Sequence, residues 1–537
     1  MSSSVSIPSS RPRRERATGK SGALWFTLAV VAGLISACAV PAPVAPNKFA
    51  REDAASLFSA GFDTIQVYYV EEPNIPRMML LGLNGLSAID PAFQAEHVDG
   101  QVRLFYAGAL TASFQAPPEK DVVRWSYLAA AALETARIRS PKIAETEIED
   151  AYKSIFDAAL SELDRFSRYQ SAKQAQSSRA HRQGYSGIGI SLGKQDEKVI
   201  AQEVFEDTPA AEAGIRPGDV IATVDGTPIE GQTLADVAPM LRGPSGSSVD
   251  LVLLRGDKRL PVTLERREVI EQTVFASIVE ATSVIKVTGF NEQTSRRMRE
   301  RIDAAKAALG PALKGVVMDL RGNRGGMLDE AVNLADLFIH DGNILTTVGR
   351  HEDAFQNFGA EPDDNAERLR LVVLIDGGSA SASEVVAAAL QDSGRGLVIG
   401  ARSFGKGTVQ RVRDLPNNGA LNLTWAVMRA PSGYMLSRFG VFPTICTGGE
   451  LASPKAVLDR IRQGEVLDAN LGPLRRAADT LDPAAQSKLL ERCADRLRTK
   501  ADRDFDMDLA LGLLDEPVLF RRINEQAMLA MRGEAKQ

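Results

Sequence analysis

Residues 371–392, LVVLIDGGSASASEVVAAALQD, contain the pattern from which the fold of this chain is most easily inferred. Five apolar residues precede Asp376, a run of small residues follows, and a helical pattern begins near Ser381. A strand, a tight turn and a helix in this order are typical of an α/β sheet. The order places Ser381 at a helix N-terminus, where free backbone N–H groups and the positive end of the helix dipole lie.

Ser381 has two interpretations. With Glu384 three residues later it matches a capping box, in which the serine contributes roughly 1 kcal/mol to stability. Alternatively, its hydroxyl is a nucleophile, and the nearby N–H groups would stabilise an oxyanion formed there. From this motif alone the cap is the favoured interpretation.

The flanking sequence continues the α/β pattern. Apolar strands are expected at VIKVTGF (284–290), GVVMDLR (315–321) and LRLVVLID (369–376), and a helix at LDEAVNLADLFI (328–339). Continuous apolar strands are typical of a sheet that is covered on both faces. We therefore predict an α/β domain over residues 269–448.

A lysine between two glycines follows this region. Lys406 lies in SFGKGTVQ (403–410), and GARSFGK (400–406) matches the start of a phosphate-binding loop. That loop requires Ser or Thr next, followed by a helix, whereas Gly407 stands there and TVQRVRDL predicts a strand. The phosphate loop is excluded, which leaves a surface lysine or a catalytic one.

Residues 185–268 contain short alternating apolar runs, and several of their motifs resemble a PDZ domain. YSGIGI (185–190) matches the carboxylate-binding loop, AGIRPGDVIATVDG (213–226) the most recognisable PDZ stretch, and TLADVAPML (233–241) the groove helix. By this resemblance, a peptide C-terminus is bound by β-augmentation. The peptide-binding residues would be Tyr185, Ser186, Gly187, Ile188, Gly189, Ile190, Leu234, Val237 and Leu241. The alternative is a small β domain without a ligand.

Taken together, the motifs resemble the carboxyl-terminal processing proteases, over roughly residues 140–445. SASASE, the 25-residue interval to Lys406, MDLRGNRGG (318–326), LDRFSRYQ (163–170) and the PDZ segment follow the family order. The resemblance implies a crotonase-like α/β-spiral protease core after the PDZ domain, and a Ser–Lys dyad. It assigns Ser381 as the nucleophile, Lys406 as the general base and Gln410 as the residue that orients the lysine. The backbone N–H groups of Gly326 and Ala382 would form the oxyanion hole, and no metal, nucleotide or other cofactor is implied.

Two further positions bear on the resemblance. Asp392 matches an acidic position near the family's site, and we expect a structural role for it. Thr444 stands where the family commonly has Asp.

The chemistry of such a dyad can be argued independently. A serine hydroxyl needs a base within hydrogen-bond reach. The chain has only four histidines, so a neutral lysine is the natural candidate. Its pKa must fall from about 10.4 to about 7–8, a change of roughly 4 kcal/mol that burial without a carboxylate partner produces. Phe404 and Val409 are compatible with such an apolar pocket.

The first fifty residues resemble an export segment. A basic stretch (9–20) precedes the apolar run GALWFTLAVVAGLISAC (22–38), the layout of a secretory signal. Ile35–Cys38 resembles a bacterial lipoprotein signal, which implies a signal peptide over 1–37, a lipid on Cys38 and a tether over 38–50. An uncleaved anchor, close to the ~20 residues that span a bilayer, and simple secretion are the alternatives. Without residues 1–37 the net charge changes from −6 to −10.

The remaining segments carry less information. Residues 51–170 are predicted to be mainly helical, 171–184 to form a linker, and 449–537 to form a helical appendage without assigned chemistry. Cys446 and Cys493 either pair in an oxidising compartment or stay buried free thiols. The acidic balance argues against a nucleic-acid partner, and the spacing of the histidines and cysteines argues against a metal site.

We therefore expect a serine endopeptidase of the bacterial cell envelope, lipid-anchored on the periplasmic side. Its substrates would be proteins with free, apolar C-termini. A non-catalytic PDZ scaffold lipoprotein with a silent core is the main alternative. A crotonase-like acyl-CoA enzyme fits the core but not the PDZ segment. The sequence leaves open a homo-oligomer or an adaptor partner.

Overall fold

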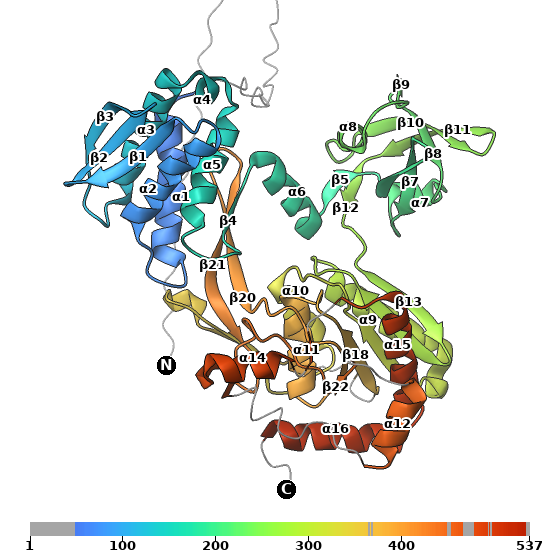
Figure 1. Cartoon of the computed structure of the whole chain (residues 1–537). Coiled ribbons are helices and arrows are strands. Elements are labelled where there is room, and N and C mark those ends of the chain that lie inside the picture. Colours follow the sequence, from blue (N-terminus) through green and yellow to red (C-terminus); the bar gives the residue numbers. More distant parts are fainter. Residues whose placement is uncertain are drawn as a thin grey trace, which may run out of the picture. The chain divides into compact units, whose positions relative to one another are not determined.

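The computed structural model describes residues 49–362, 366, 369–447, 453–464, 477–491, 493–494 and 497–532 (Figure 1). The expected export segment, including Cys38, lies outside these residues. Among the helices in the described ranges, none combines the length and the apolar character needed to cross a membrane.

A six-stranded sheet forms the centre of the C-terminal half. Its strand order is β13-β14-β15-β18-β19-β22, and every neighbouring pair is parallel except β13 with β14. The strands are β13 (Val274–Val279), β14 (Thr282–Val287), β15 (Gly315–Asp319), β18 (Leu371–Ile375), β19 (Leu397–Gly400) and β22 (Ile445–Cys446). The α/β architecture expected from the apolar strands is confirmed.

Helices cover both faces of this sheet. In β15, Val316 and Met318 pack with one group of helices, and Val317 between them packs with another. The first group is α9 (Thr294–Leu309), α10 (Leu328–Asp336) and α11 (Ala382–Asp392). The second is α12 (Pro454–Arg462), α15 (Lys500–Leu514) and α16 (Pro517–Arg532). The C-terminal region is therefore part of the α/β core, where the sequence suggested an appendage.

The C-terminal region is also bound to the core covalently. Cys446 of β22 and Cys493 form a disulfide with a Cα–Cα distance of 6.0 Å. Cys493 follows α14 (Pro483–Glu491). Of the two alternatives that the sequence left open, the paired cysteines are the one the structure contains.

A second sheet lies beside the first and has the order β17-β16-β21-β20, with β4 paired to β21. Its strands are β4 (Arg168–Gln170), β16 (Asn343–Val348), β17 (Gln356–Gly359), β20 (Thr408–Asp414) and β21 (Ala420–Arg429). The strand expected after Lys406 is β20, which begins two residues beyond the lysine.

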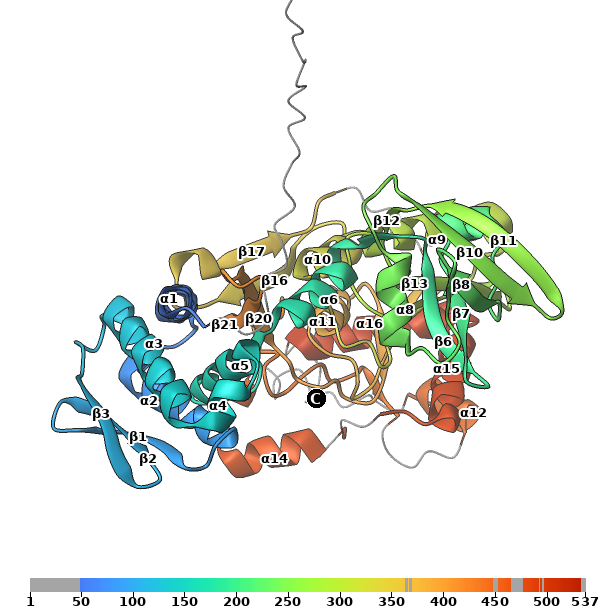
Figure 2. The same cartoon turned by 90° about the horizontal axis from the view of Figure 1, so that it is seen from above.

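The N-terminal region contains the expected helices and, in addition, a three-stranded antiparallel sheet beside α2 and α3 (Figures 1 and 2). Val102 and Leu104 of its central strand are buried against the helices. The sequence prediction of a mainly helical region did not include these strands, of which β3 has no buried side chain. The elements are α1 (Arg51–Tyr68), α2 (Ile75–Gly85), β1 (Phe93–Val98), β2 (Gln101–Tyr106), β3 (Ala109–Gln115), α3 (Val122–Arg139), α4 (Pro141–Glu145) and α5 (Ile148–Leu160).

The expected linker is helix α6 (Ala172–Gln183), and a β domain follows it. Strands β5 (Tyr185–Gly187) and β12 (Arg267–Val269) pair where the chain enters and leaves this domain. Its sheet has the order β11-β10-β8-β7-β6, with β9 paired to β8, and β6 is an edge strand. Its elements are β6 (Ile190–Gln195), β7 (Lys198–Val204), α7 (Pro209–Glu212), β8 (Val220–Val224), β9 (Thr227–Pro228), α8 (Leu234–Leu241), β10 (Ser248–Arg255) and β11 (Lys258–Glu265).

Candidate active site

Ser381 lies in the turn between β18 and α11, immediately before the helix begins. Its φ of 58° is in the left-handed region, which residues other than Gly, Asn and Asp rarely adopt. Its exposed fraction is 9%. Strained backbone of this kind is concentrated at functional sites, so the conformation adds to the case for a nucleophile.

The buried carboxylate of Glu384 connects this turn to the loop that contains Lys406. It accepts hydrogen bonds from Ser381 N–H (2.7 Å), Ser403 Oγ (2.5 Å), Gly405 N–H (2.7 Å) and Lys406 N–H (2.9 Å). Burial raises the pKa of the Glu384 carboxyl, and the four hydrogen bonds oppose that shift. Because all four partners donate, the carboxylate matches the ionised, acceptor-only form.

Lys406 extends from this loop into a partly buried position. Its Nζ lies 5.3 Å from the centroid of the Phe166 ring. Burial lowers the pKa of Lys406, the positive charge of Arg168 adds to the shift, and Glu384 and Asp164 oppose it. The direction is the one that a general base needs.

The apolar neighbour of the lysine differs from the expectation. Phe404, which the sequence suggested for the pocket, is 40% exposed. Phe166 is the ring that Lys406 Nζ contacts, and Arg165 lies over both the Phe166 and the Phe404 rings. Sequence reasoning noted LDRFSRYQ only as a family motif, because its distance from Lys406 along the chain hides the contact.

The two candidates for the dyad, Ser381 and Lys406, are not hydrogen-bonded to each other in this structure. Among the described residues, no hydrogen bond joins Ser381 Oγ to Lys406 Nζ. Gln410 Nε2 donates to Thr408 Oγ1 (3.0 Å) and Thr424 Oγ1 (3.2 Å). Catalytic hydrogen bonds are often loose in structures without substrate. The roles assigned to Ser381, Lys406 and Gln410 remain predictions.

The loop after β15 approaches Ser381 closely. A Cβ on Gly325, whose φ is 97°, would lie 2.9 Å from Ser381 Cβ and 3.0 Å from the nitrogen of Ala382. Asn323 fixes this approach, because its carbonyl accepts from Ala380 N–H (2.9 Å) and Ser383 Oγ (2.9 Å).

Both predicted oxyanion donors lie in these segments. Gly326 is the residue after Gly325, and Ala382 is the first residue of α11, where an N–H has no intrahelical partner. The donor roles of Gly326 and Ala382 remain predictions.

The two remaining core positions have structural contacts. Asp392 Oδ2 accepts from Ser432 N–H (3.0 Å) and Oγ (2.6 Å), in keeping with the structural role expected for it. Thr444, which stands where the family commonly has Asp, bridges α11 and β19. Its Oγ1 accepts from Gln391 Nε2 (3.0 Å) and Val398 N–H (3.4 Å).

The β domain contains a cavity of about 290 Å³ beside its edge strand β6. Most of the expected groove residues line it: Tyr185, Ile188, Ile190, Leu234 and Leu241. Val237 packs instead into the domain core and is fully buried. Ser186 and Gly187 of β5, and Gly189 after that strand, are not among the residues that line the cavity. Gly189 has a φ of 89°, and a Cβ there would lie 2.2 Å from Thr208 Cβ.

Charged side chains lie at the same cavity, which the sequence did not indicate. Arg242 lines it, with its guanidinium carbon 4.4 Å from the centroid of the Tyr185 ring. His181 of α6 and Glu271 form an ion pair of 2.8 Å there. The pair raises the pKa of His181 and lowers that of Glu271.

Comparison with protein families and with curated proteins agrees with this architecture. A model of peptidase family S41 matches residues 281–447, and a PDZ-domain model matches residues 202–255. A carboxy-terminal-processing protease of Bartonella bacilliformis is 35% identical over 313 residues, which cover 58% of this chain and 72% of that protein. A probable CtpA-like serine protease of Staphylococcus aureus is 32% identical over 297 residues, covering 55% of this chain and 59% of that protein.

Among solved structures, the photosystem II D1 C-terminal processing protease is 26% identical. The alignment covers 68% of this chain and 92% of that chain, with a TM-score of 0.34.

The geometry predicts that Glu384→Gln lowers kcat/KM by about tenfold to a hundredfold, the range that a small misplacement of catalytic groups produces. A glutamine would direct its NH₂ group at one of the N–H donors and loosen one loop. The measurement is hydrolysis of an unstructured reporter.

Glu330→Gln is the matched control for this variant. Glu330 is also buried in the core and accepts from Ser295 N–H (2.9 Å) and Oγ (2.8 Å), but it contacts neither loop. Equal loss of activity in both variants would show that Glu384 only stabilises the fold.

Proposed function

The chain belongs to the carboxy-terminal-processing protease family of serine-type peptidases, and we propose that it is an endopeptidase that cleaves through Ser381 and Lys406 after its PDZ domain binds a substrate C-terminus. The family and the fold class expected from the sequence are thereby confirmed. The observation that carries the finer proposal is the Glu384 carboxylate, which binds both the Ser381 turn and the Lys406 loop.

In the proposed mechanism, neutral Lys406 accepts the proton of Ser381 Oγ as that oxygen attacks a peptide carbonyl. The N–H groups of Gly326 and Ala382 then stabilise the oxyanion. Lys406 passes the proton to the leaving amine, and water releases the acyl-enzyme. No hydrogen bond joins Ser381 Oγ to Lys406 Nζ among the described residues, so the mechanism requires one to form when substrate binds.

The proposed substrates are proteins with free, apolar C-termini. Ile188, Ile190, Leu234 and Leu241 give the cavity its apolar surface, and Arg242 places a positive charge at it. The edge strand β6 can accept an extended peptide as an added strand.

We also propose that the protein works in the bacterial cell envelope, lipid-anchored through Cys38 on the periplasmic side. The support is the sequence of the first fifty residues together with the Cys446–Cys493 disulfide. Disulfides persist mainly in oxidising compartments.

The dyad predicts that Ser381→Ala and Lys406→Arg each abolish cleavage of an unstructured reporter with an apolar C-terminus. Alanine removes the nucleophile, and arginine does not deprotonate in proteins. Lys286→Arg, at an exposed lysine of β14, is the control and should retain full activity. Normal cleavage by Lys406→Arg would show that another group is the base.

The pH profile offers a separate check. Lys406 must be neutral to accept a proton, so activity should fall as the pH decreases through its lowered pKa. Arg168→Gln removes a positive charge that lowers this pKa. The midpoint of that limb should therefore move to higher pH in kcat/KM profiles, whereas Arg168→Lys should leave it in place. An unchanged midpoint in Arg168→Gln would show that the low-pH limb does not report the titration of Lys406.

The PDZ assignment predicts that a free C-terminus is required for capture. Amidating a reporter peptide should weaken its binding to the Ser381→Ala protein by about tenfold or more, because hydrogen bonds to charged groups contribute about 1.5–3 kcal/mol. Acetylating the N-terminus of the same peptide is the control and should change nothing. Equal affinity of the free and amidated peptides would show that the loop at residues 185–190 does not bind a C-terminal carboxylate.

A further inference from the structure

Charged side chains are buried together where α15 meets the core sheet. Asp506 of α15 is fully buried and accepts from both Arg498 (2.9 and 3.1 Å) and Arg321 (3.3 Å). Arg321 also binds both oxygens of Asp319, at 2.8 Å each. Buried charges remain only where they are paired and hydrogen-bonded, so the two arginines and two aspartates depend on one another.

Arg321 connects this group to the loop of the predicted oxyanion hole. It is the second residue after β15, in the segment that leads to Gly326. Its guanidinium also donates to the carbonyl of Arg503 on α15 (2.8 Å). Helix α15, which lies outside the region that matches the peptidase family, therefore holds the start of this loop.

Asp376 connects the same region to the turn of Ser381. Its Oδ1 accepts from Gly322 N–H (2.8 Å), in the loop that leads from β15 to Gly326, and from Gly378 N–H (2.9 Å), in the turn that leads from β18 to Ser381. Its Oδ2 accepts from Arg498 N–H (3.4 Å). The backbone of Arg498 therefore binds Asp376, the carboxylate that joins the Gly326 loop to the Ser381 turn.

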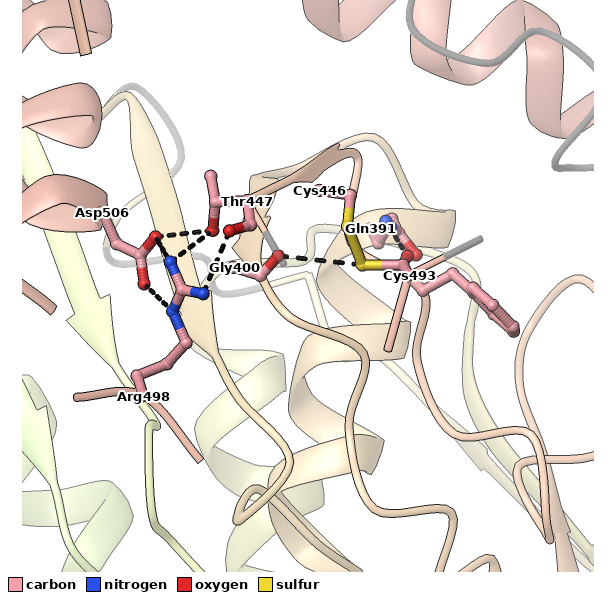
Figure 3. The surroundings of a disulfide bond; sticks show 8 residues. Gln391, Gly400, Cys446, Thr447, Cys493, Arg498 and Asp506 are labelled. Atoms are coloured by element: carbon pink, nitrogen blue, oxygen red, sulfur yellow. Dashed lines mark hydrogen bonds and ion pairs between the residues drawn. A yellow bond between two sulfur atoms is a disulfide. The ribbon is translucent and has the colours of Figure 1, made fainter. Parts of the chain in front are cut away.

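The disulfide joins Cys493, which precedes Arg498 by five residues in the chain, to Cys446 of β22 (Figure 3). Arg498 donates to Thr447 O and Oγ1, both at 3.0 Å, and Thr447 Oγ1 donates to Asp506 (2.6 Å). Thr447 N–H donates to Gly400 O (2.8 Å), at the start of the loop that leads to Lys406. The bond from Cys446, the neighbour of Thr447, to Cys493 closes this arrangement covalently.

Residues next to Cys493 in the chain also lie near the aromatic side chains around Lys406. Leu490, Glu491 and Ala494 line a cavity of about 780 Å³ together with Phe166 and Phe404. Phe166 is the ring that Lys406 contacts. Residues on both sides of Cys493 therefore face the active-site loops.

We propose that Arg498 and Asp506 are positioning residues for the peptidase reaction, and that the Cys446–Cys493 disulfide keeps them in place. They hold the loop of Gly326 and the turn of Ser381 in the relative geometry that stabilises the oxyanion. The proposal rests on the function proposed above, and the test below includes a measurement that requires no activity.

The test compares Asp506→Asn with the wild-type full-length protein. The neutral side chain removes the carboxylate that the two arginines share, leaving Arg321 paired with Asp319 and Arg498 with Asp502 (3.7 Å), so the loop of residues 320–327 should become more mobile. The expected result is a loss of kcat of about tenfold or more, with KM and the affinity for a C-terminal peptide unchanged. Amide hydrogen exchange should become faster in residues 320–327 and 376–381.

Asp515→Asn is the matched control. It makes the same substitution at the end of the same helix, where Asp515 forms a partly exposed ion pair with Lys314 (2.5 Å). This variant should keep the wild-type kcat and exchange. The double variant Cys446→Ser/Cys493→Ser should change kcat and exchange in the same direction as Asp506→Asn, and it carries the test if Asp506→Asn does not fold.

Two results would overturn the proposal. One is unchanged exchange in residues 320–327 and 376–381 in the variants, whatever their activity. The other is an equal acceleration of exchange throughout the core, which would mean general destabilisation. Faster exchange confined to these loops would support the structural coupling of Arg498 and Asp506 to them. Absence of peptide cleavage by the wild-type protein would count against the proposed function alone.

Discussion

The site depends on one buried carboxylate. Glu384 accepts hydrogen bonds from the backbone on both sides of the reaction centre, at Ser381 and at Lys406, which are 25 residues apart in the chain. A buried carboxylate is costly unless its oxygens are satisfied, and here four donors satisfy them. Each loop therefore needs the other in order to keep Glu384 paired. The strained backbone of Ser381 is held by the same contact.

This arrangement also bears on the pKa of the lysine. Glu384 is close enough to favour the charged form of Lys406, yet burial outweighs it and the pKa of Lys406 is lowered. The carboxylate accepts from the backbone N–H of Lys406, whereas Nζ extends toward Phe166. Glu384 can thus organise the loop without forming an ion pair with the ammonium group. A glutamine in the position of Glu384 would turn one acceptor oxygen into a donor and leave the N–H groups bound to that oxygen unsatisfied, and an ion pair with Nζ would keep the base protonated.

Much of the core could be predicted from the sequence, because continuous apolar strands and the SASASE and FGKGTVQ motifs are local signals. The rest depends on contacts between distant segments. Glu384 resembled an ordinary cap, and only the fold shows that it also binds Lys406. Residues 449–537 resembled an appendage because helix periodicity does not reveal what a helix covers; the structure packs them on the second face of the sheet. The pairing of Cys446 with Cys493 could not be predicted, because the sequence does not give the distance between their Cα atoms. Phe166 lies 240 residues before Lys406, so no spacing rule could join them.

The central claim is that Ser381 is the nucleophile of a centre assembled by Glu384 from two loops. The most direct measurement treats the full-length protein with a fluorophosphonate, which reacts with activated serines, and locates the adduct by mass spectrometry of its peptides. The account predicts one adduct, on Ser381, formed more slowly when Glu384 is replaced by glutamine. An adduct on a different residue, or no adduct in a preparation that cleaves its reporter, would contradict it.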